Sequence, residues 1–257
     1  MENLALKFKA CEVFSGLRLP PIPFFIRVDG RGFRKLLTEL GFSKPYDVSF
    51  AKLMVESAKS VYEGGFNPAL IYLFSDELNI LFLKENIFSR RLEKIVSVIA
   101  SLVSSTFSLK LLEIKGVRVK VAFDARAVIV GKEGILDYLI WRQNEAWRNC
   151  LNSYAYYSLL SKGLKPQEAH ELLKGLKASQ LHELIFRETG INVAKVPSWQ
   201  RKGILIYKEV KVRKGYDPVK KVRVKALRKI IKEDWDPPLF EKEGRVALSK
   251  ILSNVEI

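Results

Sequence analysis

The chain has 257 residues, of which 44 are Lys or Arg and 28 are Asp or Glu, so its formal net charge is +16. An apolar fraction of 48% suits a substantial core and excludes a disordered chain. No apolar run approaches the about 18 residues needed to cross a bilayer, and the first residues lack the features of a signal peptide. Two cysteines, Cys11 and Cys150, are too few for a disulfide framework or a structural zinc site. We therefore expect a soluble, basic, cytoplasmic globular protein without a membrane partner.

The excess positive charge is concentrated near the carboxyl terminus. Residues 201–257 carry 16 basic and 8 acidic residues, so this fifth of the chain holds half of the net charge. Between Lys208 and Lys232 there are 11 basic residues and only two acidic ones. Such segregation favours contact with nucleic-acid phosphates. The alternative is a Lys-rich solvated surface of a heat-tolerant protein.

Apolar strands and amphipathic helices alternate over the first 130 residues. In chain order, the pattern predicts a strand at Phe24–Val28, a helix at 33–40, a helix from the cap Asp47 to Gly64, paired strands at Ala69–Phe74 and Leu78–Phe82, a helix at Ile87–Thr106 and a strand pair within Val117–Val130. This order favours an α+β fold in which helices cover one face of an antiparallel sheet.

The rest of the chain divides into a helical and a strand-rich part. Helices are predicted at Tyr138–Lys162, Pro166–Leu173 and Leu181–Glu188, and strands at Ile204–Val212 and Val219–Ala226 around a turn at Lys214–Pro218. In the last strand Val222, Val224 and Ala226 alternate with Lys221, Arg223 and Lys225, which predicts a β-ribbon with an apolar and a cationic face. We expect an α+β region at 1–130, a helical region at 131–200 packed on it, and a basic ribbon and tail at 201–257.

Several kinds of active site are excluded. His170 and His182 lie in predicted helices without a neighbouring nucleophile, so a Ser-His-Asp or Cys-His site is not indicated. The glycine spacing around Gly30 and Gly32 fits neither a Walker loop nor a dinucleotide loop. Cys150 lies among aromatic residues of a predicted helix and is interpreted as a core residue.

Acidic residues stand at two unusual positions. Asp29 directly follows a hydrophobic strand, and Asp76 and Glu77 occupy the tip of a hydrophobic hairpin. Each alone is typical of a turn. If the two positions meet at one sheet edge, two carboxylates there could hold two Mg²⁺ ions for phosphoryl or nucleotidyl transfer. The Gly30 carbonyl could add a ligand, and the backbone N–H groups of 31–33 could bind a triphosphate at a helix start.

Short motifs spread along the chain share one known pattern. They are Val28–Phe33, Gly41–Pro45, Phe74–Glu77, Phe88–Lys94, Phe123–Arg126, Asp137–Gln143, Gly190–Asn192 and Arg201–Gly203. Their order closely resembles that of the tRNA-His guanylyltransferase family over roughly residues 6–206. No single block is decisive, but the ordered combination is highly specific. This family includes the wider set of 3′–5′ polymerases that repair tRNA 5′ ends.

The resemblance implies a ferredoxin-like, polymerase-type palm that works in reverse polarity. ATP or GTP would activate the 5′-monophosphate of a tRNA, and the 3′-hydroxyl of an incoming nucleotide would attack that activated end. Two Mg²⁺ ions would stabilise the charge on the phosphates. The resemblance also implies a homotetramer that holds the tRNA across subunits.

The family motifs also imply roles for individual residues. Asp29 and Asp76 would be side-chain metal ligands, Gly30 a ligand through its carbonyl, and Glu77 a catalytic neighbour that tunes the site. The nucleotide pocket would be lined by Arg31, Gly32, Phe33, Arg34 and Ser75, and a second nucleotide or triphosphate would contact Lys44, Asp47, Arg90, Arg91 and Lys94. For the last three, a solvated helix face is the alternative. Trp141, Arg142 and Gln143 match a family segment, although Trp141 also suits a core position.

The chain departs from the family where tRNA-His is recognised. Members that recognise tRNA-His carry a His-Ile-Asn-Asn-Leu-Tyr-Asn segment, of which residues 147–153 retain only Asn149 and Leu151. Tyr46 replaces a family Asn and Leu181 a family Lys. These departures favour the template-dependent branch, which restores missing 5′ nucleotides by Watson–Crick pairing.

Two alternative functions remain. A nucleotide cyclase-like enzyme would use a similar two-carboxylate palm, but it has no need of the basic carboxy-terminal region. A non-catalytic tRNA-binding module would not need Asp29 or Asp76.

Overall fold

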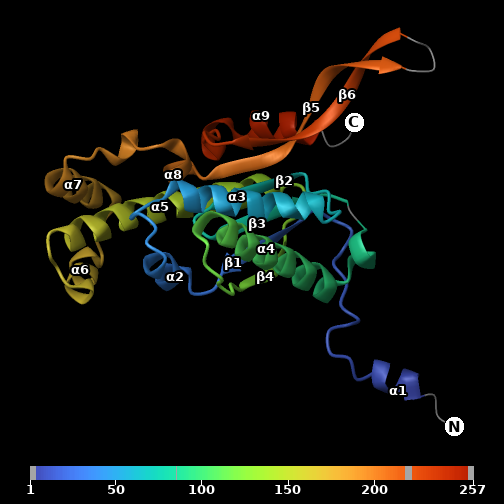
Figure 1. Cartoon of the computed structure of the whole chain (residues 1–257), viewed down its shortest axis with the longest axis horizontal. Coiled ribbons are helices and arrows are strands. Elements are labelled where there is room, and N and C mark those ends of the chain that lie inside the picture. The colour runs from blue at the N-terminus through green and yellow to red at the C-terminus, as the bar shows by residue number, and fades with distance from the viewer. Residues whose placement is uncertain (1–3, 85, 218–221, 254–257) are drawn as a thin grey trace.

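A computed structural model of the chain describes residues 4–84, 86–217 and 222–253. The elements, in order, are α1 (Leu4–Lys9), β1 (Phe24–Gly30), α2 (Phe33–Glu39), α3 (Val48–Glu63), β2 (Leu70–Phe74), β3 (Glu77–Phe82), η1 (Ile87–Arg90), α4 (Leu92–Lys115), β4 (Phe123–Ile129), α5 (Gly134–Ser161), α6 (Pro166–Leu173), α7 (Ala178–Thr189), η2 (Val193–Lys195), α8 (Ser198–Lys202), β5 (Ile204–Asp217), β6 (Val222–Asp234) and α9 (Phe240–Ser253). Figure 1 shows them around one central sheet.

The sheet has six strands in the order β4-β1-β3-β2-β5-β6, and every neighbouring pair is antiparallel. β1 lies in the centre of its half, where Asp29 is in register with Glu77 of β3 and with Asp124 of β4. The tight β2–β3 turn therefore ends at the same sheet edge as β1. The two acidic positions thus meet at one sheet edge, the arrangement that the sequence left open as the condition for a shared site.

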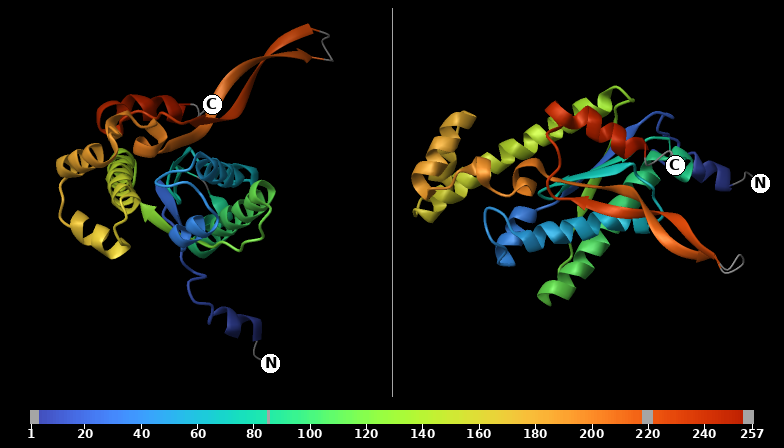
Figure 2. Two further views of the ribbon diagram at one scale, coloured as in Figure 1. Left: turned by 60° about the vertical axis from the view of Figure 1, so that its left-hand side comes forward. Right: turned by 90° about the horizontal axis from the view of Figure 1, so that it is seen from above.

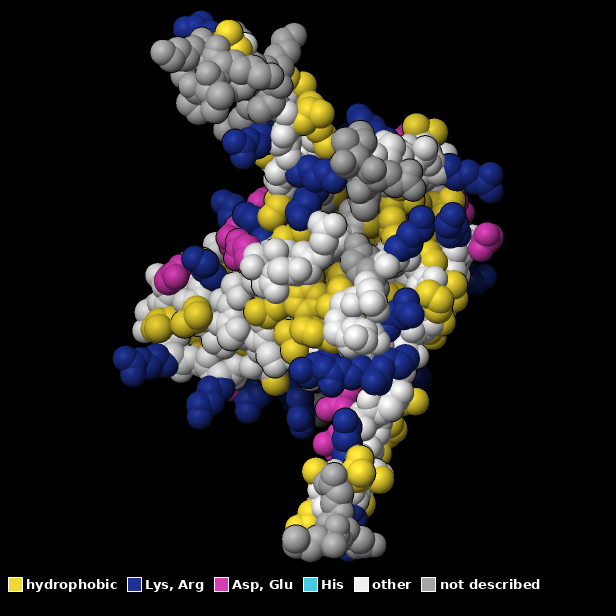
Figure 3. All heavy atoms as spheres, turned by 90° about the vertical axis from the view of Figure 1, so that its right-hand side faces the viewer, with side chains coloured by type: hydrophobic (Ala, Val, Ile, Leu, Met, Phe, Trp, Pro, Cys, Tyr) yellow, Lys and Arg dark blue, Asp and Glu magenta, His cyan; other side chains and the backbone are white. Residues whose placement is uncertain are grey.

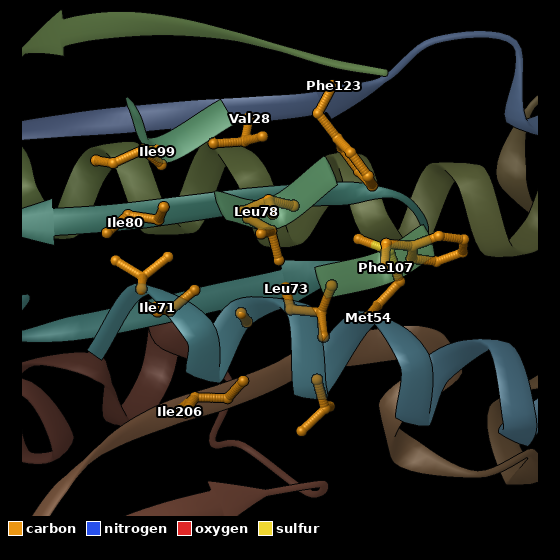
Figure 4. Packing of buried hydrophobic residues seen from close by; sticks show 14 of the residues in the cluster. Val28, Met54, Ile71, Leu73, Leu78, Ile80, Ile99, Phe107, Phe123 and Ile206 are labelled. Carbon is orange, nitrogen blue, oxygen red and sulfur yellow. The ribbon is translucent and has the colours of Figure 1, made fainter. Parts of the chain in front are cut away.

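One face of the sheet is covered by α3 and α4, as predicted. Asp47 caps α3 by accepting hydrogen bonds from the backbone N–H groups of Ser49 at 2.7 Å and Phe50 at 3.3 Å. Figure 4 shows the hydrophobic side chains that fill the layer between sheet and helices, among them Ile80, Ile99 and Phe107. This packing fixes the strands that carry the acidic residues.

The opposite face is covered by α5 and α9, so helices flank the sheet on both sides. A second hydrophobic cluster fills the space between this face of the sheet and the helices α5 and α9. In it, the rings of Phe25 and Tyr138 are stacked with 4.1 Å between their centroids. Gln143 of α5 accepts a hydrogen bond from the backbone N–H of Phe240 at the start of α9 (2.8 Å). The α+β fold is confirmed, and the helical region packs on the α+β region through α5.

Helix α4 is long and apolar enough to span a membrane by length and composition, with a mean hydropathy of 1.8. Its buried residues recur at helical spacing, namely Ile95, Ile99, Val103, Phe107 and Leu111, and they pack into the core against the sheet. This pattern is that of a core helix. Serine residues interrupt the apolar sequence of α4, so it contains no long unbroken apolar run.

Several predicted boundaries were wrong, among them the starts of α5 and α7, which lie four and three residues earlier than predicted. The expected strand pair within Val117–Val130 is a single strand, β4, and Val119 and Val121 instead pack against the core without strand pairing. Helix α4 begins later and ends later than predicted, at Leu92 and Lys115. The ribbon strands are longer than predicted, because β5 continues through the expected turn to Asp217.

The β5–β6 ribbon begins in the sheet and ends outside the body of the protein. β5 pairs with β2 only through Ile204, Leu205 and Ile206, whereas it pairs with β6 along its whole length. Figure 2 shows the outer part of the ribbon projecting beyond the helices. On its described part, Figure 3 shows both basic and hydrophobic side chains. Val212 and Leu227 are exposed there. The predicted separation into two faces involves residues whose side chains the structure does not describe.

Candidate active site

Asp29 and Asp76 form the centre of the candidate site. Asp29 ends β1, and Asp76 lies in the β2–β3 turn beside it. Ser75 adopts a left-handed backbone conformation (φ 49°), and its hydroxyl donates a hydrogen bond to Oδ1 of Asp76 (2.9 Å). Burial raises the pKa of Asp76, and the nearby charge of Asp29 raises it further, against the effects of Ser75 and Lys44. The fold therefore holds two carboxylates together at an electrostatic cost.

Gly30 lets this turn approach β1. A Cβ atom at position 30 would lie 2.5 Å from Cδ2 of Phe33 and 2.9 Å from Oδ2 of Asp76. The Phe33 ring cannot move away easily, because it is buried against Phe107 and Phe123. Glycine is therefore required for close packing at this position.

Glu77 has different partners from its neighbour. Its Oε1 accepts hydrogen bonds from Nε of Arg142 (2.9 Å) and from Nδ2 of Asn79 (2.8 Å), and its Oε2 accepts one from Nη2 of Arg142 (2.7 Å). The hydroxyl of Tyr138 completes the buried network through Oδ1 of Asn79 (2.6 Å). Burial raises the pKa of Glu77, while these donors favour its ionised form. Glu77 thus ties the β2–β3 turn to α5.

A cavity of about 630 Å³ opens beside Asp76. Its walls come from α2 and the segment that follows, from the β2–β3 turn, and from α5 and α6. The polar residues of the lining include Arg34, Ser43, Lys44, Asp47, Ser75, Asp76, Arg148, Asn149, Asn152, Tyr156, Tyr157, His170 and Lys174. A volume of this size suits a nucleotide-sized ligand.

Two cations face two tyrosines across this cavity. The guanidinium of Arg34 lies 5.8 Å from the ring centre of Tyr156, and the ammonium of Lys44 lies 5.9 Å from that of Tyr157. Burial lowers the pKa of Lys44, and the charge of Arg34 lowers it further. Burial would raise the pKa of Asp47, but hydrogen bonds from backbone N–H groups outweigh it and lower that pKa. The wall beside Asp76 is thus a preformed site for a polyanion.

Several predicted nucleotide contacts are not brought to this cavity. Arg90, Arg91 and Lys94 follow β3 at the sheet end where Phe82 pairs with Phe24, opposite the turn that carries Asp76. The backbone N–H of Arg31 donates to the carbonyl of Ala122 (2.9 Å), so it is not free to bind a triphosphate as expected. Gly32 precedes α2, and Phe33 contributes its ring to the cavity.

The α5 wall of the cavity was not predicted from the sequence, and neither was a site role for His170, which also lines the cavity. Along α5, Arg148, Asn149, Asn152 and Tyr156 recur at intervals that place them on one side of a helix. This polar spacing was visible in the sequence. That these residues line a cavity could not be predicted, because it depends on how α5 packs across the sheet.

The oxygen ligands at the site suit a hard cation. Asp29, Asp76 and the Gly30 carbonyl offer the oxygen donors that Mg²⁺ prefers, and the raised pKa of Asp76 indicates a charge that a cation would relieve. Among the described residues, the structure has no group of three or more His, Cys, Asp or Glu side chains that could hold a metal ion. A cation here would therefore complete its coordination with other oxygens, such as those of a substrate.

Three departures from the family pattern meet behind the cavity. Tyr46, Cys150 and Leu181 belong to one hydrophobic cluster, which also contains Ile185 and Val193. Burial raises the pKa of the Cys150 thiol to about 12, and Tyr46 is a hydrogen-bond partner of that thiol. An apolar cluster therefore replaces the polar residues that the family pattern carries at these positions.

The chain was compared with known families and proteins. The family model described as "tRNAHis guanylyltransferase" matches residues 6–131, and "Thg1 C terminal domain" matches residues 133–236. A "Probable tRNA(His) guanylyltransferase" of Drosophila melanogaster is 34% identical over 196 residues, or 74% of this chain and 68% of that protein. The tRNA(His) guanylyltransferase of Debaryomyces hansenii is 31% identical over 219 residues, or 82% of this chain and 83% of the relative.

Solved structures agree with these matches. A bacterial tRNA(His) guanylyltransferase-like protein in complex with ATP has a TM-score of 0.78 at 25% identity, over 97% of this chain and 99% of that one. The tRNA(His) guanylyltransferase of Saccharomyces cerevisiae has a TM-score of 0.70 at 27% identity, over 80% and 92% of the two chains. The fold and these relatives define a nucleotidyltransferase. The chain belongs to the tRNA(His) guanylyltransferase family, which confirms the resemblance of its motifs.

Proposed function

We propose that this chain adds nucleotides to tRNA 5′ ends in the 3′–5′ direction, with ATP or GTP activating the 5′-monophosphate. The observation that carries the proposal is the carboxylate pair Asp29 and Asp76, of which Asp76 lines a cavity that also contains Arg34 and Lys44. The bound ATP of the bacterial relative supports a nucleoside triphosphate as ligand. The triphosphate would contact Arg34 and Lys44, and the base would lie toward the tyrosines of α5.

The acidic residues would hold two Mg²⁺ ions. Asp29, Asp76 and the Gly30 carbonyl would bind them, and the ions would stabilise charge on the reacting phosphates when bound. The chain's own contribution is to keep Asp76 in place, through Ser75 on one side and Gly30 on the other. We assign Glu77 a positioning role, because both its oxygens accept hydrogen bonds from Arg142.

Within the family, we place this chain in the template-dependent repair branch. The support is the hydrophobic cluster around Cys150, in which Tyr46 and Leu181 occupy positions of tRNA-His recognition. Because these side chains pack together, the polar pattern is lost as a unit rather than by scattered substitutions. The template base of the tRNA would then select the incoming nucleotide.

We also propose a homotetramer. The cations Arg90, Arg91 and Lys94 lie at the sheet end remote from the chain's own cavity. A triphosphate role for them therefore requires a site on a neighbouring copy. The solvated helix face is the alternative for these residues, and it predicts that their removal leaves activity unchanged.

The basic ribbon separates this function from a nucleotide cyclase. A cyclase acts on a free triphosphate and needs no cationic strand pair that projects from the body. A tRNA carries many phosphates, and exposed Lys and Arg side chains on such an extension can neutralise them. Lys211, Arg223 and Arg228 are exposed on its described part.

A comparison of RNA substrates tests the proposed function. The purified chain with Mg²⁺ and all four nucleoside triphosphates is incubated with 5′-truncated tRNAs that differ in the opposing template base, and with complete tRNA-His. We expect extension of the truncated tRNAs by the complementary nucleotide, with loss of activity in Asp29→Asn and Asp76→Asn. Unchanged RNA length in every case would refute the proposed nucleotide addition. Addition of G opposite any base would refute the assignment to the template-dependent branch.

A further inference from the structure

Trp141 is an exposed aromatic side chain on the sheet-facing helix α5. Half of its surface is open to solvent, although it belongs to a helix whose neighbouring residue Arg142 is buried. Its ring is held in place by Tyr138 (5.6 Å between ring centroids) and by the guanidinium of Arg142 (4.4 Å). A rigid, half-open indole is not explained by packing of the core.

A second guanidinium lies beside this ring. The guanidinium of Arg27 on β1 lies 5.9 Å from the ring centre of Trp141. Its buried Nε has no hydrogen-bond partner within the described parts of the chain, although its charge acts on the Glu77 carboxylate and helps to lower the pKa of that group. On the neighbouring strand β4, Arg126 is in register with Arg27 and adds another guanidinium. Buried donors are normally satisfied, so this one indicates a missing acceptor.

The Trp141 side chain is adjacent to the candidate active site. Arg27 and Asp29 are two residues apart on β1, so their side chains lie on the same face of the sheet, about 7 Å apart along the strand. Glu77, opposite Asp29, is bound by Arg142, the residue that follows Trp141. The indole thus lies over the middle of β1, on the sheet face that carries Asp29 and Glu77.

Helix α5 connects this ring to the cavity. Trp141, Glu145, Arg148 and Asn152 follow one another at intervals of three or four residues and form a strip along one side of the helix, with Asn149 beside it. The strip passes into the cavity wall at Arg148 and Asn149. From Trp141 to Asn149 the helix rises by about 12 Å. An elongated polyanion could follow this strip past the carboxylate pair.

We propose that Trp141 is a stacking platform for an unpaired base of the RNA substrate, with Arg27 contacting the adjoining phosphate. The inference rests on the proposed function for the identity of the ligand, an RNA end. An aromatic face with flanking guanidinium groups is the chemistry that binds single-stranded nucleic acid. A protein partner is not favoured, because the surroundings of the ring are cationic rather than apolar.

Binding to a defined RNA tests this platform without catalysis. The probe is a fluorescent hairpin RNA with a 5′-monophosphate and four unpaired 3′ nucleotides, measured by anisotropy in EDTA without nucleoside triphosphates. In a parallel series, each unpaired nucleotide is replaced by an abasic one. We expect Trp141→Ala to weaken binding about tenfold, and Trp141→Phe to weaken it less than threefold. One abasic position should weaken binding by the unaltered chain and leave binding by Trp141→Ala unchanged.

The control is Phe186→Ala, which removes an aromatic ring of similar exposure from α7. It should bind all probes like the unaltered chain, and thermal unfolding should show each variant folded. Equal affinity of Trp141→Ala and the unaltered chain would overturn the platform, as would an equal loss for every abasic probe. Because no step requires extension, a chain that binds in this way but does not extend RNA would refute the proposed function alone.

Discussion

The guanidinium of Arg142 holds both carboxylate oxygens of Glu77, at 2.9 and 2.7 Å, in a buried ion pair between α5 and the β2–β3 turn. Glu77 directly follows Asp76, so this pair fixes the backbone of the residue that completes the carboxylate pair. Both partners are buried, with 6% of Arg142 and 8% of Glu77 exposed. The Glu77–Arg142 ion pair therefore contributes both to the stability of the fold and to the position of the site.

Removing one partner should be strongly destabilising. Arg142→Ala leaves the Glu77 carboxylate buried without its cation, and we expect unfolding in urea to require about 3–5 kcal/mol less free energy. Arg187→Ala, which breaks an exposed pair with Glu188, should change it by less than about 1 kcal/mol. Equal effects of the two substitutions would show that the buried pair does not support the turn.

The raised pKa of Asp76 has a consequence for stability. The unfolded chain loses this proton at lower pH than the folded chain, so the stability of the metal-free protein should fall as pH rises through the folded pKa. We expect Asp76→Asn to abolish that part of the pH dependence and to raise the melting temperature in EDTA at pH 7.5. Thermal unfolding between pH 4 and pH 8 measures both effects.

The same variant tests for a bound cation. Mg²⁺ should raise the melting temperature of the unaltered chain, since it binds the folded state, and should not raise that of Asp76→Asn. The control is Asp124→Asn, whose carboxylate is bound by Arg126 at 2.5 Å. It should keep the Mg²⁺ effect. A Mg²⁺ effect of equal size in Asp76→Asn would exclude Asp76 as a ligand.

Gly30→Ala should damage the site by contact alone. Its methyl group would lie within 2.9 Å of Asp76 and closer still to Phe33, so the turn must move. We expect loss of Mg²⁺-dependent nucleotide addition and a lowered melting temperature. Gly16→Ala is the matched control, since a Cβ atom there meets nothing within 4 Å. If Gly30→Ala keeps full activity, the close approach of β1 and the turn is not needed.

The ribbon should contribute to the salt dependence of tRNA binding. Replacing residues 212–227 by Asn-Gly keeps the strand pairs at its base and removes six basic residues and one acidic residue. The slope of log K against log salt should fall by about 0.7–0.9 for each lost phosphate contact. Lys242→Gln with Arg245→Gln on α9 is the control. An unchanged slope in the shortened chain would make the ribbon a solvated surface.

The parts of the fold that sequence could predict are those with local causes. β1 and the β2–β3 hairpin are short apolar runs bounded by turns, and α3 has its own cap in Asp47. The meeting of Asp29 and Asp76 was only a possibility from the order of these elements, because it required β1 to pair with the hairpin strand β3. The segment that precedes β4 misled the prediction, since the alternation of Val119 and Val121 is used for packing and not for pairing.

The remaining features depend on contacts between distant residues. Glu77 and Arg142 are 65 positions apart, so no local pattern could assign the carboxylate to an ion pair instead of to the metal site. The tyrosines of the cavity wall, Tyr156 and Tyr157, gain their function only from the way α5 crosses the sheet. The exposure of Trp141 likewise follows from tertiary packing.

The apolar cluster beside the cavity constrains which single substitutions the chain can accept. Leu181 is buried beside Cys150, with Tyr46 packed against the cluster. A lone Leu181→Lys would bury an ammonium among apolar side chains, and a lone Cys150→Asn would bury an amide there, each at a loss of stability. Single polar substitutions in this cluster should therefore be destabilising. Polar residues at these positions would have to be introduced together, so that buried polar groups can pair with one another.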